Sequence, residues 1–188
     1  CERSCMRPRV TLDKELIRTI LAVYALSPDG THGPGHWGRV LETGLRLTEM
    51  TGGAPSVVAL FALLHDARRI NDGRDPGHGR RGADLARSVG AGKLGITDEQ
   101  LEILTTACER HTDGLTDGNV TLLTCWDADR LDLWRVSIVP EDRFLCTAAA
   151  RDGALKHWAR ERSLSGHVPR FVTELWLGES DLSRGGSF

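Results

Sequence analysis

One apolar run constrains this chain more than any other feature. Residues 57–64 are all hydrophobic, and His65 and Asp66 follow them directly. A helix that is apolar on nearly every side is expected to be buried. A buried polar group without a partner costs roughly 2–7 kcal/mol. The imidazole and the carboxylate therefore need a compensating partner, and a bound cation is the simplest candidate.

The overall composition narrows the class of protein. A chain of 188 residues suits one domain with a sizeable core. The near-balanced charge, formally −2, argues against a nucleic-acid binder and against a basic membrane-surface protein. No apolar run approaches the roughly 20 residues of a transmembrane helix, and the first eight residues lack the apolar segment of a signal peptide. Five scattered cysteines favour a reduced, cytoplasmic protein, with Cys1 and Cys5 in a tail.

Hydrophobic residues recur at helical spacing along most of the chain, and no stretch alternates as a strand would. We therefore expect an all-α, single-domain bundle over residues 11–178, with Thr11 as the first N-cap and with tails at 1–10 and 179–188. The expected helices are residues 11–26, 36–51, 56–70, 78–89, 98–111, 120–134, 144–163 and 171–177.

Three further polar residues lie beside apolar helical stretches. His36 heads the second expected helix, His111 ends the fifth, and Asp127 lies within the sixth. Together with His65 and Asp66 they form a mixed nitrogen and oxygen donor set, which suits Mn²⁺, Fe²⁺, Co²⁺, Ni²⁺, Zn²⁺ or, less well, Mg²⁺. Side chains from facing helices can meet in the centre of a bundle and build such a site.

The order of these residues resembles that of the HD-domain metal-dependent phosphohydrolases, a family with a His, then an adjacent His-Asp, then a distant Asp. His36, the pair His65-Asp66 and Asp127 match this signature, and the resemblance covers about residues 30–135. It implies a helical bundle with one divalent metal ion in its centre, held by these four residues. It also implies open positions on the metal for water and a phosphate oxygen.

Two more histidines resemble additions seen in dinuclear members of the family. His78, followed by Gly82, looks like their His-x-x-x-Gly element, and His111 looks like a shortened form of a later motif. The chain lacks the Gly-Tyr-Pro of the cyclic-dinucleotide phosphodiesterases and has Arg69 where they usually have Lys. We expect one metal ion, with His78 and His111 as candidates for a second metal or for catalysis.

Arginines near the expected ligands suggest an anionic substrate. Arg39 follows His36 by about one turn, and Arg69 follows Asp66 in the same way. Guanidinium groups suit phosphate oxygens. Both arginines are therefore candidates for binding a substrate phosphate.

Other interpretations remain open for several residues. Arg69 could form a salt bridge to Asp72 or Glu109, and Asp72 is also a candidate for proton transfer. His111 could cap a helix end, and His78 could mark a plain helix entry. The remaining histidines are expected at the surface: His32, His157 and His167.

These features favour a metal-dependent phosphohydrolase that acts on a small phosphorylated substrate such as a nucleotide or another phosphomonoester. Two alternatives come from other classes. One is an HD module that senses a nucleotide without cleaving it, and the other is a dinuclear iron oxygenase of the HD type. No nucleic acid or membrane is expected as a partner.

Overall fold

The computed structural model describes residues 12–178, and every regular element in that part of the chain is helical. The prediction of an all-α single domain is confirmed. The expected tails, residues 1–10 and 179–188, and the expected cap Thr11 lie outside the described residues. The α-helices are α1 Lys14–Ala22, α2 Pro34–Thr51, α3 Pro55–Leu64, α4 His78–Val89, α5 Ala91–Leu94, α6 Asp98–Arg110, α7 Val120–Arg130 and α8 Gly153–Leu164. Three short elements complete them: the 3₁₀ helices η1 Leu133–Val136 and η2 Asp142–Phe144, and the π-helix η3 Val172–Leu177.

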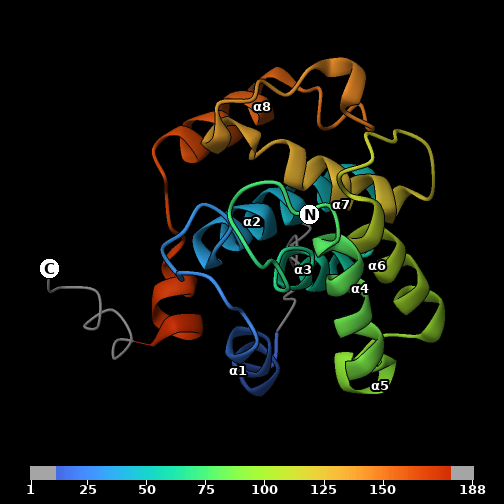
Figure 1. The fold of residues 1–188 in the computed structure, drawn as a ribbon. Coiled ribbons are helices and arrows are strands. Elements are labelled where there is room, and N and C mark those ends of the chain that lie inside the picture. The colour runs from blue at the N-terminus through green and yellow to red at the C-terminus, as the bar shows by residue number, and fades with distance from the viewer. Residues whose placement is uncertain (1–11, 179–188) are drawn as a thin grey trace, which may run out of the picture.

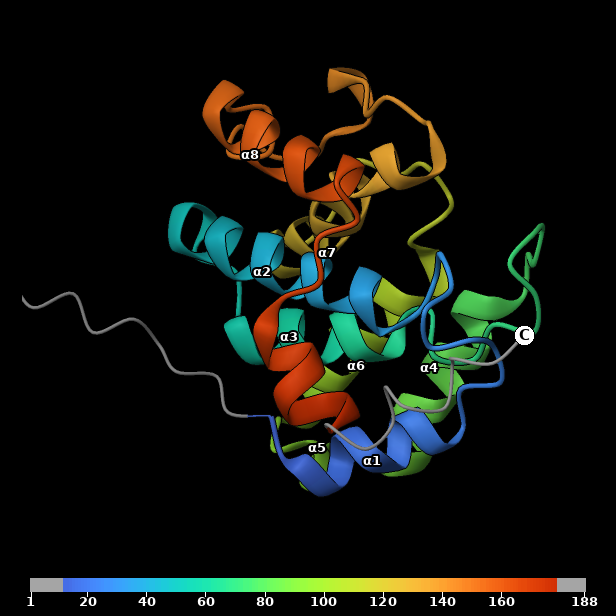
Figure 2. The ribbon, with the colours of Figure 1, turned by 90° about the vertical axis from the view of Figure 1, so that its left-hand side faces the viewer.

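The apolar helix α3 lies in the middle of the bundle (Figure 1). Every residue from Val57 to Leu64 is buried, as the sequence predicted. Helices α2, α6 and α7 pack against it, and α4 packs chiefly against α6. In both views α8 lies at one end of the bundle and α1 at the other (Figures 1 and 2). Among the described residues, no helix is long and apolar enough to cross a membrane.

Side-chain caps fix where several helices begin. Asp13 accepts a hydrogen bond from the backbone of Leu16 and starts α1. Thr97 and Gln100 form a capping box at the start of α6, each side chain bonded to the other's backbone nitrogen. Such caps satisfy the backbone donors that the first turn leaves free.

The helix that carries the central pair is shorter than predicted. It was expected over residues 56–70, but α3 ends at Leu64 and His65 is its C-cap. The last regular bond runs from His65 N to Phe61 O (3.0 Å), after which Ala67 N donates to Leu64 O in a tighter turn. His65 and Asp66 therefore stand at the end of the helix, where they can face the neighbouring helices.

The predicted helix over residues 144–163 is wrong in its first half, because α8 begins only at Gly153. The backbone nitrogens of Cys146 and Thr147 donate to the carboxylate of Asp127, at 2.6 and 2.8 Å. These two N–H groups therefore bind a side chain and do not form the backbone hydrogen bonds of a helix. Asp152 then caps α8 by accepting a hydrogen bond from Leu155 N.

Helix α4 comes unusually close to the end of α3 at Gly82. A Cβ built at Gly82 would lie 2.5 Å from the carbonyl oxygen of Leu64 and 3.1 Å from that of His65. The glycine therefore allows α4, which begins at His78, to pack directly beside the central pair.

We expect Gly82→Ala to lower the free energy of unfolding by about 1–3 kcal/mol, because the added methyl group meets backbone that cannot move aside. Gly92→Ala is the matched control. Gly92 lies in the short helix α5, and a Cβ there would meet nothing within 4 Å. Urea denaturation of both variants measures the difference, and equal stabilities would contradict the close contact.

Candidate metal centre

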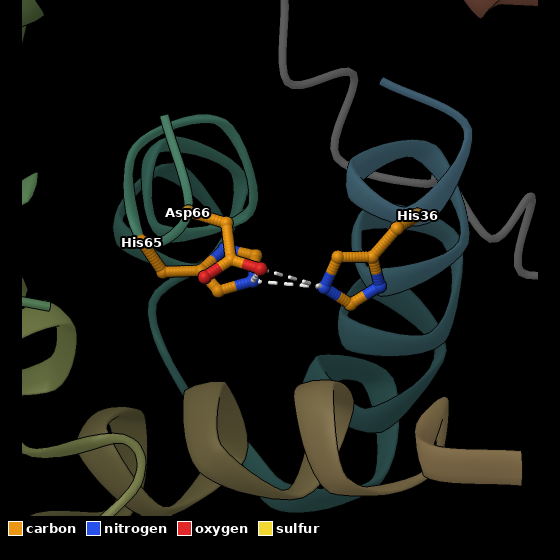
Figure 3. A group of neighbouring side chains, drawn as sticks. All are labelled: His36, His65 and Asp66. Carbon is orange, nitrogen blue, oxygen red and sulfur yellow. Dashed lines mark hydrogen bonds and ion pairs between the residues drawn. The ribbon is translucent and has the colours of Figure 1, made fainter. Parts of the chain in front are cut away.

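Four histidines from different elements turn their Nε2 atoms towards one another. His36 comes from the first turn of α2, His65 is the C-cap of α3, His78 opens α4 and His111 is the C-cap of α6. The Nε2 atoms of His36 and His65 are 3.0 Å apart, and those of His78 and His111 are 2.9 Å apart. All four residues are buried. Figure 3 shows the rings of His36 and His65 facing each other beside Asp66.

The hydrogen bond that the other ring nitrogen, Nδ1, makes fixes the tautomer of each histidine. In three of the rings it contacts a backbone carbonyl, which can only accept, and in the fourth it contacts a carboxylate. The partners are Phe61 O for His65 (3.0 Å), Cys108 O for His111 (2.7 Å), Asp75 O for His78, and Asp132 Oδ2 for His36 (2.7 Å). Each Nδ1 is therefore a donor, and in a neutral ring each Nε2 keeps a lone pair. Arg69 Nη1 lies 3.3 Å from the Nε2 of His78, and the Nε2 of the other three rings has no such donor among residues 12–178. Histidines that bind metals show this arrangement, with the outer nitrogen donating to a carbonyl or carboxylate.

Burial favours the neutral form of His65 and His78. It lowers the pKa of His65 to about 3, outweighing the nearby carboxylates of Asp66 and Asp129, which act to raise it. Burial and the neighbouring His111 also lower the pKa of His78. Two bare lone pairs about 3 Å apart repel each other, and a cation between them removes that repulsion. The donor set therefore fits a metal ion.

Asp66 connects the two histidine pairs. Its Oδ2 is 3.7 Å from the Nε2 of His36 and 3.8 Å from that of His65, and its Oδ1 is 3.2 Å from the Nε2 of His78. Burial acts to raise the pKa of Asp66, but its histidine neighbours, His65 first, and a hydrogen bond with His32 hold that pKa well below the usual range. The carboxylate is therefore ionised and faces both pairs.

These contacts define two groups that could hold a metal ion. In each group the potential ligand atoms all lie within 4.8 Å of one another, and Asp66 belongs to both. The first group is His36, His65 and Asp66, and the second is Asp66, His78 and His111.

The structure does not bring Asp127 into either group, which corrects the sequence-based choice of this residue as a ligand. Its carboxylate accepts hydrogen bonds from Cys146 N (2.6 Å), Thr147 N (2.8 Å) and Thr147 Oγ1 (2.7 Å). Burial raises the pKa of Asp127, and these hydrogen bonds only partly oppose the rise. Asp127 organises the turn before α8.

Asp129 faces the histidines instead. Its Oδ1 lies 3.4 Å from the Nε2 of His36 and 3.7 Å from that of His65. Residues two apart on a helix point in nearly opposite directions, so Asp127 and Asp129 cannot both face the centre. Burial acts to raise the pKa of Asp129, but the neighbouring histidines, His36 first, lower it overall. Asp129 thus adds a fourth donor to the first group.

Arg69, a predicted phosphate contact, lies at the edge of the histidine cluster and bonds to residues of the chain itself. Its Nη1 is 3.4 Å from Asp66 Oδ1 and 3.3 Å from His78 Nε2, and its Nη2 donates to Gly73 O at 2.8 Å. Its ion pair is with Asp66 and not with the alternatives Asp72 or Glu109. Asp72 is exposed, and its side chain makes no hydrogen bond or ion pair with the rest of residues 12–178.

Arg39 is bonded to Asp132, which in turn is bonded to one of the four histidines. Its Nε and Nη2 donate to the two oxygens of Asp132 at 2.8 and 3.0 Å, and its Nη1 donates to His167 O at 3.0 Å. Asp132 in turn accepts the Nδ1–H of His36. Arg39 therefore fixes the residue that orients His36.

Three residues at the centre were not anticipated from the sequence: Asp129, Asp132 and His32. His32, expected at the surface, is half-buried, and its Nδ1 lies 3.0 Å from Asp66 Oδ2. It lies in the loop before α2, where no helical periodicity indicates which way its side chain points. His157 is exposed, as expected, and His167 is half-buried.

A scan against protein-family models, a search of curated proteins and a search of solved structures each found no match to this chain. The geometry alone describes the site: buried histidines and aspartates that could hold a metal ion, in an arrangement compatible with the HD type.

Substitutions of Asp127 and Asp129 in α7 should separate an effect on metal binding from an effect on the stability of the fold. We expect Asp129→Asn to weaken metal binding by about tenfold or more, because it removes a charged donor from the first group. Asp127→Asn should leave the metal content unchanged and lower the free energy of unfolding by about 1–3 kcal/mol, because it disturbs a buried set of hydrogen bonds. Elemental analysis after dialysis and urea denaturation measure the two effects. The reverse pattern would restore Asp127 as a ligand.

Proposed function

We propose that this chain is a divalent-metal-dependent phosphohydrolase of the HD type that acts on a small phosphorylated molecule. One observation carries the proposal: the Nε2 atoms of two buried histidine pairs converge on a shared carboxylate, Asp66. The order of His36, His65-Asp66 and a later aspartate along the chain supports the resemblance, with Asp129 in the closing position.

We further propose two metal ions, where the sequence led us to expect one. The first would be held by His36, His65, Asp66 and Asp129, and the second by the other oxygen of Asp66 with two further histidines. Those histidines are His78 and His111. Two-metal sites serve hydrolysis in phosphatases, nucleases and aminopeptidases, and Asp66 would belong to both ligand sets because it faces both histidine pairs.

When bound, such ions lower the pKa of a water molecule towards about 7 and polarise a phosphoryl oxygen. The chain's own residues would orient the metal ligands and bind the substrate. Asp132 and the backbone carbonyls hold the imidazoles in one tautomer and orientation. Arg69, already at the cluster, would offer its guanidinium N–H groups to a phosphate oxygen.

The shared carboxylate also favours a second candidate, a dinuclear iron oxygenase. Two histidine pairs on one carboxylate suit iron as well as manganese or zinc. The candidates differ in metal and in cosubstrate, since only the oxygenase requires iron and consumes dioxygen. Elemental analysis with an oxygen-uptake measurement therefore separates them.

The purified protein loaded with Mn²⁺, Co²⁺, Ni²⁺ or Mg²⁺ should release inorganic phosphate from at least one member of a broad panel of phosphomonoesters. We expect His65→Ala and Asp66→Ala to reduce the rate by about 100-fold or more, because each removes a donor from the metal centre. His157→Ala, on the exposed face of α8, is the control and should keep full activity. Absence of turnover with metal demonstrably bound would refute the hydrolase, and nucleotide binding without turnover would favour a sensing module.

A further inference from the structure

Two cavities border the metal centre from different sides. The larger, of about 610 Å³, meets it only at His36, a ring that is 1 % exposed and whose Nδ1 is bonded to Asp132. The smaller, of about 240 Å³, is lined by His111 and Asp129. Asp129 is 8 % exposed, more than any other proposed ligand. The smaller cavity therefore offers the more direct approach to the ligand atoms.

The wall of this smaller cavity is mainly apolar. Ile138, Val139 and Phe144 at its rim are 52 %, 59 % and 40 % exposed, large fractions for such side chains. Among the described residues that line it, the one carboxylate besides Asp129 belongs to Glu141, which is paired with Arg143 at 3.0 and 3.1 Å. Its volume lies below the roughly 300–1,000 Å³ typical of sites for drug-sized ligands. A small, partly apolar ligand fits these properties.

One positive charge in the wall of the cavity, that of Arg130, has no counter-ion in the part of the chain that the structure describes. Arg130 is 5 % exposed, and its Nη1 donates to Phe144 O and to Cys146 Sγ (3.2 Å). Its Nη2 is buried without a hydrogen-bond partner, and no carboxylate within residues 12–178 pairs with it inside 4.0 Å. The ring of Trp126, 5.7 Å from its Cζ, offsets the charge only in part.

The other buried arginines near the centre differ from Arg130. Arg39 pairs with Asp132 and Arg69 with Asp66. A buried charge without a partner is strongly unfavourable, so an anion from outside the chain would complete the environment of Arg130.

We propose that the smaller cavity receives the substrate, and that it selects phosphate monoesters of small apolar or aromatic alcohols over nucleotides. This rests on the proposed hydrolase function. Arg130 binds an anionic oxygen of the phosphate, and Ile138, Val139 and Phe144 pack against the alcohol portion. Hydrolysis breaks the P–O bond to the alcohol and forms a P–O bond from water. One proton of the water goes to the alcohol and the other stays with inorganic phosphate.

A matched pair of substitutions tests which cavity is used. Ile138→Trp would narrow the smaller cavity, and Leu164→Trp would narrow the larger one, at a side chain of nearly equal exposure, 52 % against 53 %. With phenyl phosphate we expect Ile138→Trp to lower kcat/KM by about tenfold or more and Leu164→Trp to leave it unchanged. The wild type should prefer phenyl phosphate to adenosine monophosphate. Loss of activity in Leu164→Trp alone, or a preference for the nucleotide that Ile138→Trp does not alter, would overturn the assignment.

Binding of phenylphosphonate, which is not hydrolysed, tests Arg130 without relying on turnover. Calorimetry on metal-loaded protein should show affinity weakened about 10- to 100-fold in Arg130→Met, and less in Arg130→Lys, because a charge-assisted hydrogen bond is lost or altered. Arg170→Gln, an exposed arginine paired with Glu174, is the charge-matched control. Unchanged affinity in a folded Arg130→Met protein would refute the role of Arg130.

The surface variant Ile138→Trp keeps the cavity testable even where Arg130→Met fails to fold. Failure of the cavity assignment can also be told from failure of the hydrolase itself. Phenylphosphonate binding that Ile138→Trp weakens, in a protein that releases no phosphate from any ester, would support the cavity and refute the hydrolase. Phosphate release that Ile138→Trp and Arg130→Met leave unchanged would support the hydrolase and refute the cavity assignment.

Discussion

The burial of the Asp66 carboxylate among five imidazoles is the constraint on which the rest of this structure depends. An ionised group in a helical core must be compensated, and the side chains gathered around this one stand at the ends of helices. His65 and His111 are C-caps of α3 and α6, and each donates its Nδ1–H to a carbonyl near the end of its own helix. These hydrogen bonds hold each ring against the end of its own helix and direct its Nε2 lone pair towards the centre.

The parts of the site that the sequence predicted are those where a polar residue interrupts a strong apolar pattern. His65 and Asp66 stand out because the run before them admits no polar residue at all. The start of α4 at His78 was also predicted, since Pro76 and Gly77 punctuate the chain there. In these places local pattern and tertiary packing agree, so the linear sequence was sufficient.

The choice between Asp127 and Asp129 shows where the sequence is insufficient. Both lie in α7 and both are buried. Only the rotation of α7 about its axis decides which carboxylate faces the histidines, and that rotation depends on packing against α2 and α3. The same packing brings Cys146 and Thr147 under Asp127, which explains why the helix predicted from residue 144 begins only at Gly153.

The remaining contacts join residues far apart in the chain, where no periodicity could have linked them. Asp132 binds both His36 and Arg39 across more than 90 positions, and His32 reaches Asp66 across 34. Such pairs can be recognised only when the positions of the helices in three dimensions are known.

The charges gathered around the centre also constrain its ligand. Two carboxylates, Asp66 and Asp129, face the histidines, and Arg69 already neutralises part of the first. Two divalent ions would outweigh these carboxylates and leave the centre with net positive charge. Arg130, in the wall of the smaller cavity that reaches Asp129, would add to that charge. A neutral substrate would leave this excess uncompensated in a buried site, whereas a phosphate dianion would offset half of it. This difference supports the proposed phosphoryl chemistry over chemistry on an uncharged substrate, whether or not the ions are redox-active.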